Sequence, residues 1–539
     1  WIDDDVRMTL RADMHSPCFC DVCLNEMRQR TGKKFAREEL TALILKNPPN
    51  NIRDEWLKYQ NELECDIVKM LANAVHEKSP ETKVCLMHSG MEVHSAEGRR
   101  WNDIIAALGL PEPTFRPSIG PYVESMGIPV VDAFNTTRLA QAALPSGTKI
   151  APEIENYPHS SFFKSKAMVK ANLEFGQLLG IKEMTFSIYR FGGRLDLEIA
   201  REDKWSGLLG GIKPKLQAIA NLDVNQNEIK GVSLYWNENS AQKTRYVENM
   251  PKPIFLFRAR PWDNVLPAIG IGTQYGLGNI NAFSGENIEC LSDSELEGVF
   301  SDGVLLDARA AESLLIRGRG ELAGLVRRKE NVSASMEIIE DKKFGGLKGD
   351  VINLRYTSCA WQFSFNKKAM RISKLVGYDG EERGHGFVLF ENSLGGRVVI
   401  CPFDGQACET AGLGLSFRPL ESPSFISRPR QTQIISSLEW AAGGALPIVV
   451  SSSPFIYPLL IQKKNRLIVG LWNLMADSTE KIMFKVKKPS FGIRCVMVLC
   501  EDGNWKEVKS SIANMGGYIL VKTNILLKYL ETCILVTDG

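Results

Sequence analysis

The chain has 539 residues, of which 44% are hydrophobic and 24% charged, an ordinary composition for a globular protein with several buried cores. Lys and Arg number 65 against 63 Asp and Glu, so the formal net charge of +2 argues against a nucleic-acid or membrane-surface partner. No run approaches the roughly 18 uninterrupted apolar residues of a transmembrane helix, so none is predicted.

Residues 1–225 alternate helical patterns with short apolar strands. Residues 51–78 carry apolar side chains at the spacing of one helix face, and 160–179 and 205–220 are two further predicted helices. The predicted strands are 83–88, 129–133, 149–154 and 183–189. This alternation predicts a parallel sheet with helices packed outside it.

Two further regions follow. Residues 226–342 combine buried strands such as GVSLYWN and GVLLDA with capped helices, and they predict a small doubly wound α/β domain. Residues 343–539 are rich in β patterns, with a hairpin turn at 394–396 and one helix at 431–442. We expect this last region to complete the second domain and then to form a C-terminal β-sandwich.

Three of the 12 cysteines, Cys18, Cys20 and Cys23, form a C-x-C-x2-C cluster. Thiolates at this spacing suit a tetrahedral structural Zn²⁺, although a cluster of free thiols is the alternative. The fourth ligand stays open between His15, Cys65 and a residue upstream of the chain. The other cysteines are scattered as buried thiols are, which favours a reducing, cytoplasmic compartment.

Carboxylates gather at two predicted strand ends. Asp3, Asp4 and Asp5 follow the first two residues, while Glu153 and Glu155 stand two positions apart in APEIENYP. An acidic residue at the C-terminal edge of a barrel strand is typical of a catalytic residue, and glycoside hydrolysis needs two facing carboxylates. Each cluster alone is more typical of a cap or an ion pair, but together they indicate a hydrolytic site.

The segments WIDDDVRM, CFCDVCLNEM and PEIENYPHSSFFKS resemble the clan A glycoside hydrolases, in particular the family 42 β-galactosidases or a related family of trimeric β-mannosidases. The resemblance implies a (β/α)8 TIM barrel, a flavodoxin-like domain similar to glutamine amidotransferases, and a small β domain. It also implies a glycoside or oligosaccharide substrate and a homotrimer. The cysteine cluster matches three ligands of the family's zinc, which is structural, so no catalytic cofactor is expected.

By this resemblance Glu155 is the nucleophile, followed by the substrate-binding Tyr157, with Glu153 as the competing choice. The acid/base falls on Asp4 or Asp5, where the family has Glu preceded by Asn. An Asp side chain is one methylene shorter, and retaining hydrolysis needs carboxyls about 5–5.5 Å apart, so this departure favours a divergent family.

Sugar-binding candidates also stand at predicted strand ends. These are Trp1, His88, Tyr189 and Arg190, although a lone histidine such as His88 is equally typical of a core. The middle domain has no amidotransferase chemistry of its own, because Arg309 follows GVLLDA where those enzymes have a cysteine and residues 226–342 contain no His. We expect that domain to be a scaffold.

The sequence therefore predicts a retaining exo-β-glycosidase for β-galactosides or β-mannosides. The rival hypotheses are a catalytically degenerate carbohydrate-binding or assembly protein on the same scaffold, and a zinc hydrolase that uses the cysteine site. Residues 1–225 supply only strands four or five to eight of an eight-stranded barrel. We therefore expect the first strands, about 100–150 residues, to precede Trp1.

Overall fold

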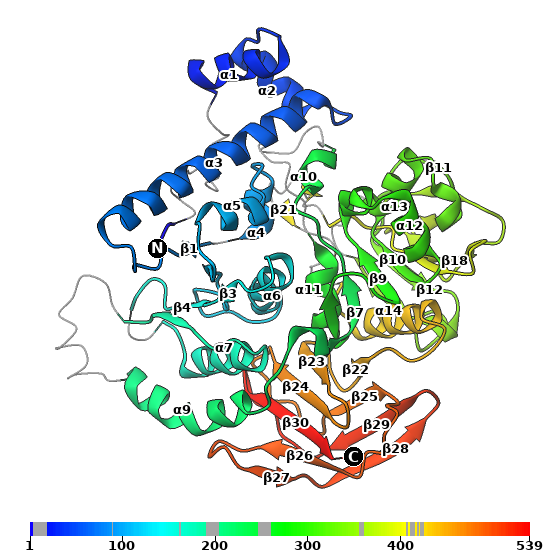
Figure 1. Ribbon diagram of the computed structural model, residues 1–539. Coiled ribbons are helices and arrows are strands. Elements are labelled where there is room, and N and C mark those ends of the chain that lie inside the picture. The colour runs from blue at the N-terminus through cyan, green and yellow to red at the C-terminus, as the bar shows by residue number, and fades with distance from the viewer. Residues whose placement is uncertain are drawn as a thin grey trace.

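The computed structural model describes residues 1–3, 19–88, 90–160, 163–189, 204–245, 260–354, 360–405, 408–409, 416–417, 420 and 425–538. Figure 1 shows three parts in chain order, namely an α/β part, a second α/β part and a β-rich part at the C-terminus. No helix in the described ranges combines the length and apolar character needed to cross a membrane.

A row of short parallel strands forms the centre of the first part. Ile2 pairs with β1 (Leu86–Met87), which is followed in space by β2 (Thr114–Arg116), β3 (Lys149–Ile150) with β4 (Glu153–Glu155), and β5 (Thr185–Ser187). A bridge between Ser118 and Glu153 joins β4 to the β2 segment. Because every pairing is parallel, the carboxyl ends of all these strands lie at one edge.

Six helices of the described residues lie around this row: α3 (Asn51–Lys78), α4 (Met91–Ser95), α5 (Trp101–Ala107), α6 (Ile128–Ala143), α7 (Lys166–Leu178) and α9 (Lys204–Ala220). Two more, α1 (Asp21–Thr31) and α2 (Arg37–Leu45), pack on α3 away from the strands (Figure 1). The predicted helices 51–78, 160–179 and 205–220 are confirmed as α3, α7 and α9. Phe134 of α6 and Phe175 of α7 stack at 3.8 Å between ring centroids, which fixes these two helices against each other.

The strand predicted at 129–133 is wrong, because these residues lie in α6. Pro129 falls in the first turn, where a helix needs no N–H donor, and Val130, Val131 and Phe134 share a buried face at helical spacing. The strand of this unit is β2, three residues between Pro113 and Pro117, which is too short to show a period in the sequence.

The second part contains a seven-stranded sheet in the order β15-β18-β19-β10-β9-β7-β8. Its strands are β7 (Val232–Leu234), β8 (Thr273–Tyr275), β9 (Ile280–Phe283), β10 (Gly303–Leu306), β15 (Met370–Arg371), β18 (Val388–Glu391) and β19 (Arg397–Ile400). The five parallel strands follow the 2-1-3-4-5 order of flavodoxin-like sheets, although the short turn 276–279 replaces the helix between the second and third.

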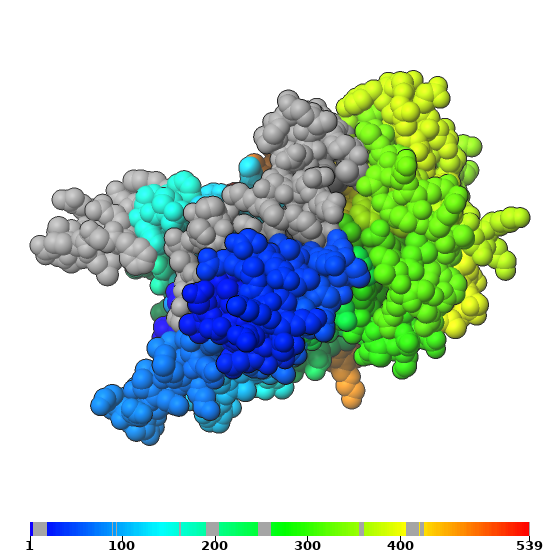
Figure 2. All heavy atoms as spheres, turned by 90° about the horizontal axis from the view of Figure 1, so that it is seen from above, coloured from blue at the N-terminus to red at the C-terminus, as the bar shows by residue number. Residues whose placement is uncertain are grey.

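Helices pack on both faces of this sheet. They are α11 (Pro261–Ala268), α12 (Asp293–Phe300), α13 (Ala308–Ile316) and α14 (Arg428–Ala441). The short helix α10 (Ser240–Lys243) packs against α3 instead, where Ala241 joins the core of α1–α3. Leu305 of β10 joins the core that holds α11 and α14, whereas Val304 and Leu306 join the core under α12 and α13. In the view from above, α1–α3 lie beside this second part (Figure 2), and the guanidinium of Arg53 donates to the carbonyl of Thr244.

Smaller sheets extend the second part. They consist of β11 (Leu325–Arg328) with β14 (Phe363–Phe365), the four strands β12 (Met336–Ile339), β13 (Val351–Asn353), β16 (Ser373–Val376) and β17 (Glu382–His385), and the pair β20 (Cys408–Glu409) with β21 (Ser416–Phe417). The hairpin predicted around 394–396 is confirmed as β18 and β19.

The C-terminal part is two facing antiparallel sheets. One holds β22 (Ile448–Val450), β25 (Met483–Lys487), β29 (Tyr518–Thr523) and β28 (Ser510–Met515). The other holds β27 (Trp505–Glu507), β26 (Cys495–Leu499), β30 (Thr532–Asp538), β24 (Leu467–Asn473), β23 (Ile456–Gln462) and β6 (Ile229–Lys230). The outermost strand β6 comes from the chain segment ahead of the second part, so the sandwich is not built from C-terminal residues alone.

Candidate active site

The candidate site lies at the carboxyl edge of the parallel row in the first part. The backbone N–H of His88, just after β1, donates to the carbonyl of Arg116 at the end of β2 at 3.0 Å. The N–H of Asn156, just after β4, donates to the carbonyl of Ser187 at the end of β5 at 3.0 Å. These bonds join the strand ends in two pairs, β1 with β2 and β4 with β5. The predicted carboxylates Glu153 and Glu155 belong to β4.

Glu153 and Glu155 both lie on β4, as the prediction that they share one face requires. Ile154 between them is completely buried in the core with α6 and α7, so the two carboxylates point to the other face. Glu153 is paired with Arg116 (Oε1 to Nη1, 2.6 Å) and accepts from the hydroxyl of Tyr122 at 3.4 Å. Glu153 is therefore held by partners at both oxygens.

Glu155 lies at the end of the strand and is less committed. Its Oε1 is 3.1 Å from Nε2 of His159, and the ring of His159 meets the ring of Tyr157 edge-on at 5.9 Å. Burial raises the pKa of Glu155, and the negative charge of Glu153 raises it further, while Lys164 and Arg116 oppose the shift. A carboxyl with a raised pKa at the end of a barrel-type strand is suited to catalysis.

Lys164 holds the backbone around Glu155 in place. Its ammonium is buried and donates to the carbonyl of Glu155 and, at 2.9 Å, to the carbonyl of Pro121. Burial lowers the pKa of Lys164 to about 8, although the nearby carboxylates of Glu124 and Glu155 resist the shift. Lys164 thus ties the loop after β4 to the loop after β2 and places a cation near the two glutamates.

The other sequence candidates lie at the same edge with different exposure. The ring of Trp1 is 54% exposed and contacts the guanidinium of Arg116 at 5.8 Å, and Tyr157 is 55% exposed. His88 is buried against Trp101, with ring centroids at 4.2 Å, and Tyr189 is half-buried. The structure thus brings these strand ends together, and sugar binding by each of them stays a prediction. Asp4, Asp5 and Arg190 lie outside the described residues.

Sequence reasoning missed Arg116, Tyr122, His159 and Lys164 as members of the site. His159 and Lys164 fall within the segment PEIENYPHSSFFKS, so its likeness to a strand-end loop was the signal that could have found them. Arg116 and Tyr122 carried no signal, because they belong to the short strand β2 and its loop, which the sequence pattern did not reveal.

Cys20 and Cys23 of the cysteine cluster lie at the start of α1. The sulfurs of Cys20 and Cys23 are 3.8 Å apart, and the hydroxyl of Tyr59 is 3.7 Å from Cys23 Sγ. Two thiolates on one tetrahedral Zn²⁺, with bonds of about 2.3 Å, also lie about 3.8 Å apart, so this pair fits the ion. Cys18 and His15 lie outside the described residues, and the described part of the chain holds no group of three or more metal ligands.

Cys65 does not join this pair. It packs in the core with α5, whereas Cys23 packs in the core of α1 and α2. Burial and the nearby carboxylate of Asp103 raise the pKa of the Cys65 thiol to about 12, which disfavours the thiolate that a metal requires.

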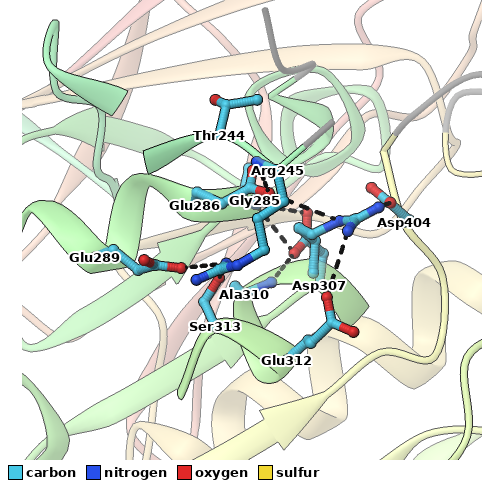
Figure 3. Close-up of polar contacts among 12 residues, drawn as sticks. Thr244, Arg245, Gly285, Glu286, Glu289, Asp307, Ala310, Glu312, Ser313 and Asp404 are labelled. Atoms are coloured by element: carbon cyan, nitrogen blue, oxygen red, sulfur yellow. Dashed lines mark hydrogen bonds and ion pairs between the residues drawn. The ribbon is translucent and has the colours of Figure 1, made fainter. Parts of the chain in front are cut away.

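The corresponding edge of the second part is filled by ion pairs (Figure 3). Arg309, just after β10, pairs with Asp404 at 3.1 Å and with Glu312 at 3.3 Å, and its guanidinium stacks on Trp361 at 4.3 Å. Asp307 accepts from the backbone N–H of Ala310 at 2.8 Å, and burial with the charge of Asp404 raises its pKa well above the usual range.

The crevice between β7 and β9, where such sheets bind ligands, is also occupied by the chain itself. The N–H of Asn237 donates to Asn287 at 3.0 Å, and the N–H of Arg245 donates to Glu286 at 3.1 Å. The side chain of Arg245 pairs with Glu289, as Figure 3 shows. The scaffold role of the second part stays a prediction.

No protein-family model and no curated protein sequence matches the chain. Solved structures do match its fold. An α-L-fucosidase isoenzyme 2 from Paenibacillus thiaminolyticus aligns with 97% of this chain and 75% of its own, at a TM-score of 0.62 and 12% identity. A β-galactosidase from Bacillus circulans sp. alkalophilus aligns over 97% and 78%, at a TM-score of 0.59 and 12% identity.

A GH42 β-galactosidase from G. stearothermophilus aligns over 97% of this chain and 77% of its own, at a TM-score of 0.55 and 10% identity. The chain is thus a mixed α/β protein whose fold resembles that of clan A glycoside hydrolases of the GH42 type, as the sequence motifs indicated.

Proposed function

We propose that the protein is a retaining exo-β-glycosidase that hydrolyses β-galactosides or β-mannosides. The observation that carries the proposal is the position of Glu155: a half-buried carboxyl at the carboxyl end of a parallel strand, in a fold that resembles β-galactosidases. Glu155 is chosen over Glu153 because both oxygens of Glu153 are already held by Arg116 and Tyr122.

In this mechanism the ionised carboxylate of Glu155 attacks the anomeric carbon and forms a covalent glycosyl-enzyme. Asp4 or Asp5 donates a proton to the leaving oxygen and then takes a proton from the water that releases the sugar. In the sequence both aspartates follow Ile2, which pairs with Leu86 of β1. Trp1 and Tyr157, both exposed, supply aromatic surface for a sugar ring.

The wider architecture is proposed by the same resemblance. The parallel row from Ile2 to β5 corresponds to strands four to eight of a (β/α)8 barrel, residues 226–342 begin an amidotransferase-like domain that forms a homotrimer, and a β-sandwich follows. The fit of the Cys20 and Cys23 sulfurs to tetrahedral geometry supports a structural Zn²⁺ at the cysteine cluster.

The test is turnover of a panel of aryl β-glycosides by the wild type and by the variants E155Q and E153Q. We expect E155Q to lose nearly all activity with its circular dichroism unchanged, because the nucleophile is gone while the strand is intact. E153Q should keep measurable turnover, since Glu153 only holds Arg116 and Tyr122. Retained activity in E155Q contradicts the assignment.

A second measurement separates the nucleophile from the acid/base. Adding azide to E155A should restore cleavage of an activated aryl glycoside and give a glycosyl azide of inverted configuration, because azide fills the space of the lost carboxylate. Binding of glycosides without turnover by the wild type would instead favour the degenerate carbohydrate-binding protein, which the Asp in place of the family's Glu makes the second candidate.

A further inference from the structure

A cavity of about 720 Å³ lies at one face of the C-terminal sandwich, far along the chain from Glu155. Its walls come from the end of α9, from the turn between β23 and β24, and from the sheet strands β26, β27 and β30. This volume falls within the range typical of small-molecule sites.

The floor of the cavity is apolar. Trp505 of β27, Met497 of β26 and Val536 of β30 line it, and pairings of these strands place the three side chains on one face of the sheet. Trp505 and Val536 pack partly against the main core and are half-buried, so the indole presents a supported surface. At the neighbouring β26–β27 turn, Gly503 approaches Pro214 of α9 so closely that an added Cβ would lie 2.6 Å from its carbonyl oxygen.

The rim of the cavity is cationic. Lys463 is neutralised, because its ammonium pairs with Glu228 at 2.9 Å and donates to the carbonyl of Asp223 at 2.8 Å. Lys464 and Arg466 line the same cavity, and neither side chain makes a hydrogen bond or ion pair with any described residue, although the charge of Arg466 helps to lower the pKa of the nearby Glu228. The side-chain donors of Lys464 and Arg466 can therefore bind an anion, and the indole of Trp505 can contact an apolar ring face of the same ligand.

We propose that this cavity binds a uronic acid residue of an acidic saccharide. The apolar face of the pyranose ring stacks on Trp505, and the carboxylate is bound by the guanidinium fork of Arg466 with Lys464 beside it. The choice of a sugar rests on the proposed glycosidase function, while the anionic charge and the aromatic contact rest on the cavity itself.

The test measures binding of trigalacturonate and of a neutral trigalactoside by calorimetry, using the full chain as E155Q so that neither ligand is consumed. We expect trigalacturonate to bind at least tenfold more tightly than the neutral trisaccharide, and salt to weaken it. R466Q and W505A should each weaken trigalacturonate binding at least tenfold, because each removes one of the two contacts.

The matched control is K506Q. Lys506 is an exposed cation directly after Trp505, and strand alternation directs it to the opposite face of β27, so its loss should leave binding unchanged. Should W505A fail to fold, R466Q and K464Q, both at the surface turn, still test the site. Equal affinity in R466Q, equal binding of the neutral trisaccharide, or no binding of trigalacturonate overturns the proposal.

The cavity and the proposed function fail separately. The single variant R466Q, with Glu155 intact, should hydrolyse neutral aryl glycosides at the same rate as the wild type, because the cavity is not part of the Glu155 site. If the E155Q chain does not bind trigalacturonate while the wild type hydrolyses neutral aryl glycosides, the cavity proposal alone is rejected. Trigalacturonate binding that R466Q abolishes, in a protein without any glycosidase activity, rejects the proposed function alone.

Discussion

Arg116 acts on both glutamates of the candidate site. It pairs with Glu153 at 2.6 Å, and its positive charge also lowers the pKa of Glu155 against the opposing effects of burial and Glu153. We expect R116Q to raise the pKa of Glu155, so that the acid limb of kcat/KM against pH moves to higher pH. The nucleophile would then ionise later as the pH rises.

The control is K149Q, which removes a surface cation that pairs with Glu112 at the opposite end of the strand row. Its acid limb should match the wild type. An unshifted limb in R116Q would show that Arg116 does not act on the nucleophile.

Lys164 gives a prediction for stability above neutral pH. Burial lowers its pKa in the folded protein to about 8 from an ordinary 10.5, so between these values the unfolded chain binds the proton and the folded chain does not. The free energy of unfolding therefore gains a positive slope with pH in that interval. Urea titrations at about pH 7.5 and about pH 10 measure this slope. Between the two pH values, the free energy of unfolding should rise less for K164M than for the wild type.

K166M is the matched control, since Lys166 is exposed two residues away. A rise in K164M equal to that of the wild type would contradict the buried cation. Arg116 could not be predicted as a site residue, because the sequence pattern did not reveal the short strand that carries it. Lys164 could have been found, because it stands in the segment PEIENYPHSSFFKS.

At the scale of elements, α1 is where a zinc ion would act. Cys20 precedes its first turn and Cys23 lies buried within it, so a bound ion would fix the start of this helix. We expect about one Zn²⁺ per chain by metal analysis, and a lower melting temperature after chelation or in C23S, with the activity of the folded fraction retained. The control is C495S, which lies in the terminal sheet and should keep its Zn²⁺. Loss of activity before loss of structure would instead favour the zinc hydrolase.

The long elements were predictable and the short ones were not. Helix α3 was predicted with its full bounds because 28 residues give many repeats of the helical period. Strand β2 has three residues between prolines, and it was missed in favour of a run that folds into α6. Since β2 carries Arg116, the missed strand and the missed site residue have the same cause.

At the scale of the whole molecule, the buried ammonium of Lys215 joins the first part to the terminal sandwich. Lys215 of α9 pairs with Glu174 of α7 at 3.0 Å, and with Glu501 after β26 at 2.9 Å. Lys215 and Glu174 are 1% and 0% exposed, so K215M leaves a buried carboxylate with only the longer ion pair to Lys170 at 3.8 Å and should cost at most about 3–5 kcal/mol of unfolding free energy. Denaturant unfolding measures this loss.

The double variant K215M/E174L should recover most of that stability, because it removes both charges from the interior. A double variant as unstable as K215M would mean that packing, and not the unpaired charge, is responsible.

The position of β6 sets the order in which the molecule can be assembled. Ile229 pairs with Ile461, so the ribosome releases the outermost strand of the terminal sheet long before the strand that it borders exists. The whole second α/β part lies between β6 and β23 in the sequence. Pairing of strands so far apart in the chain is slow. The terminal sheet is therefore complete only after nearly the whole chain has been synthesised.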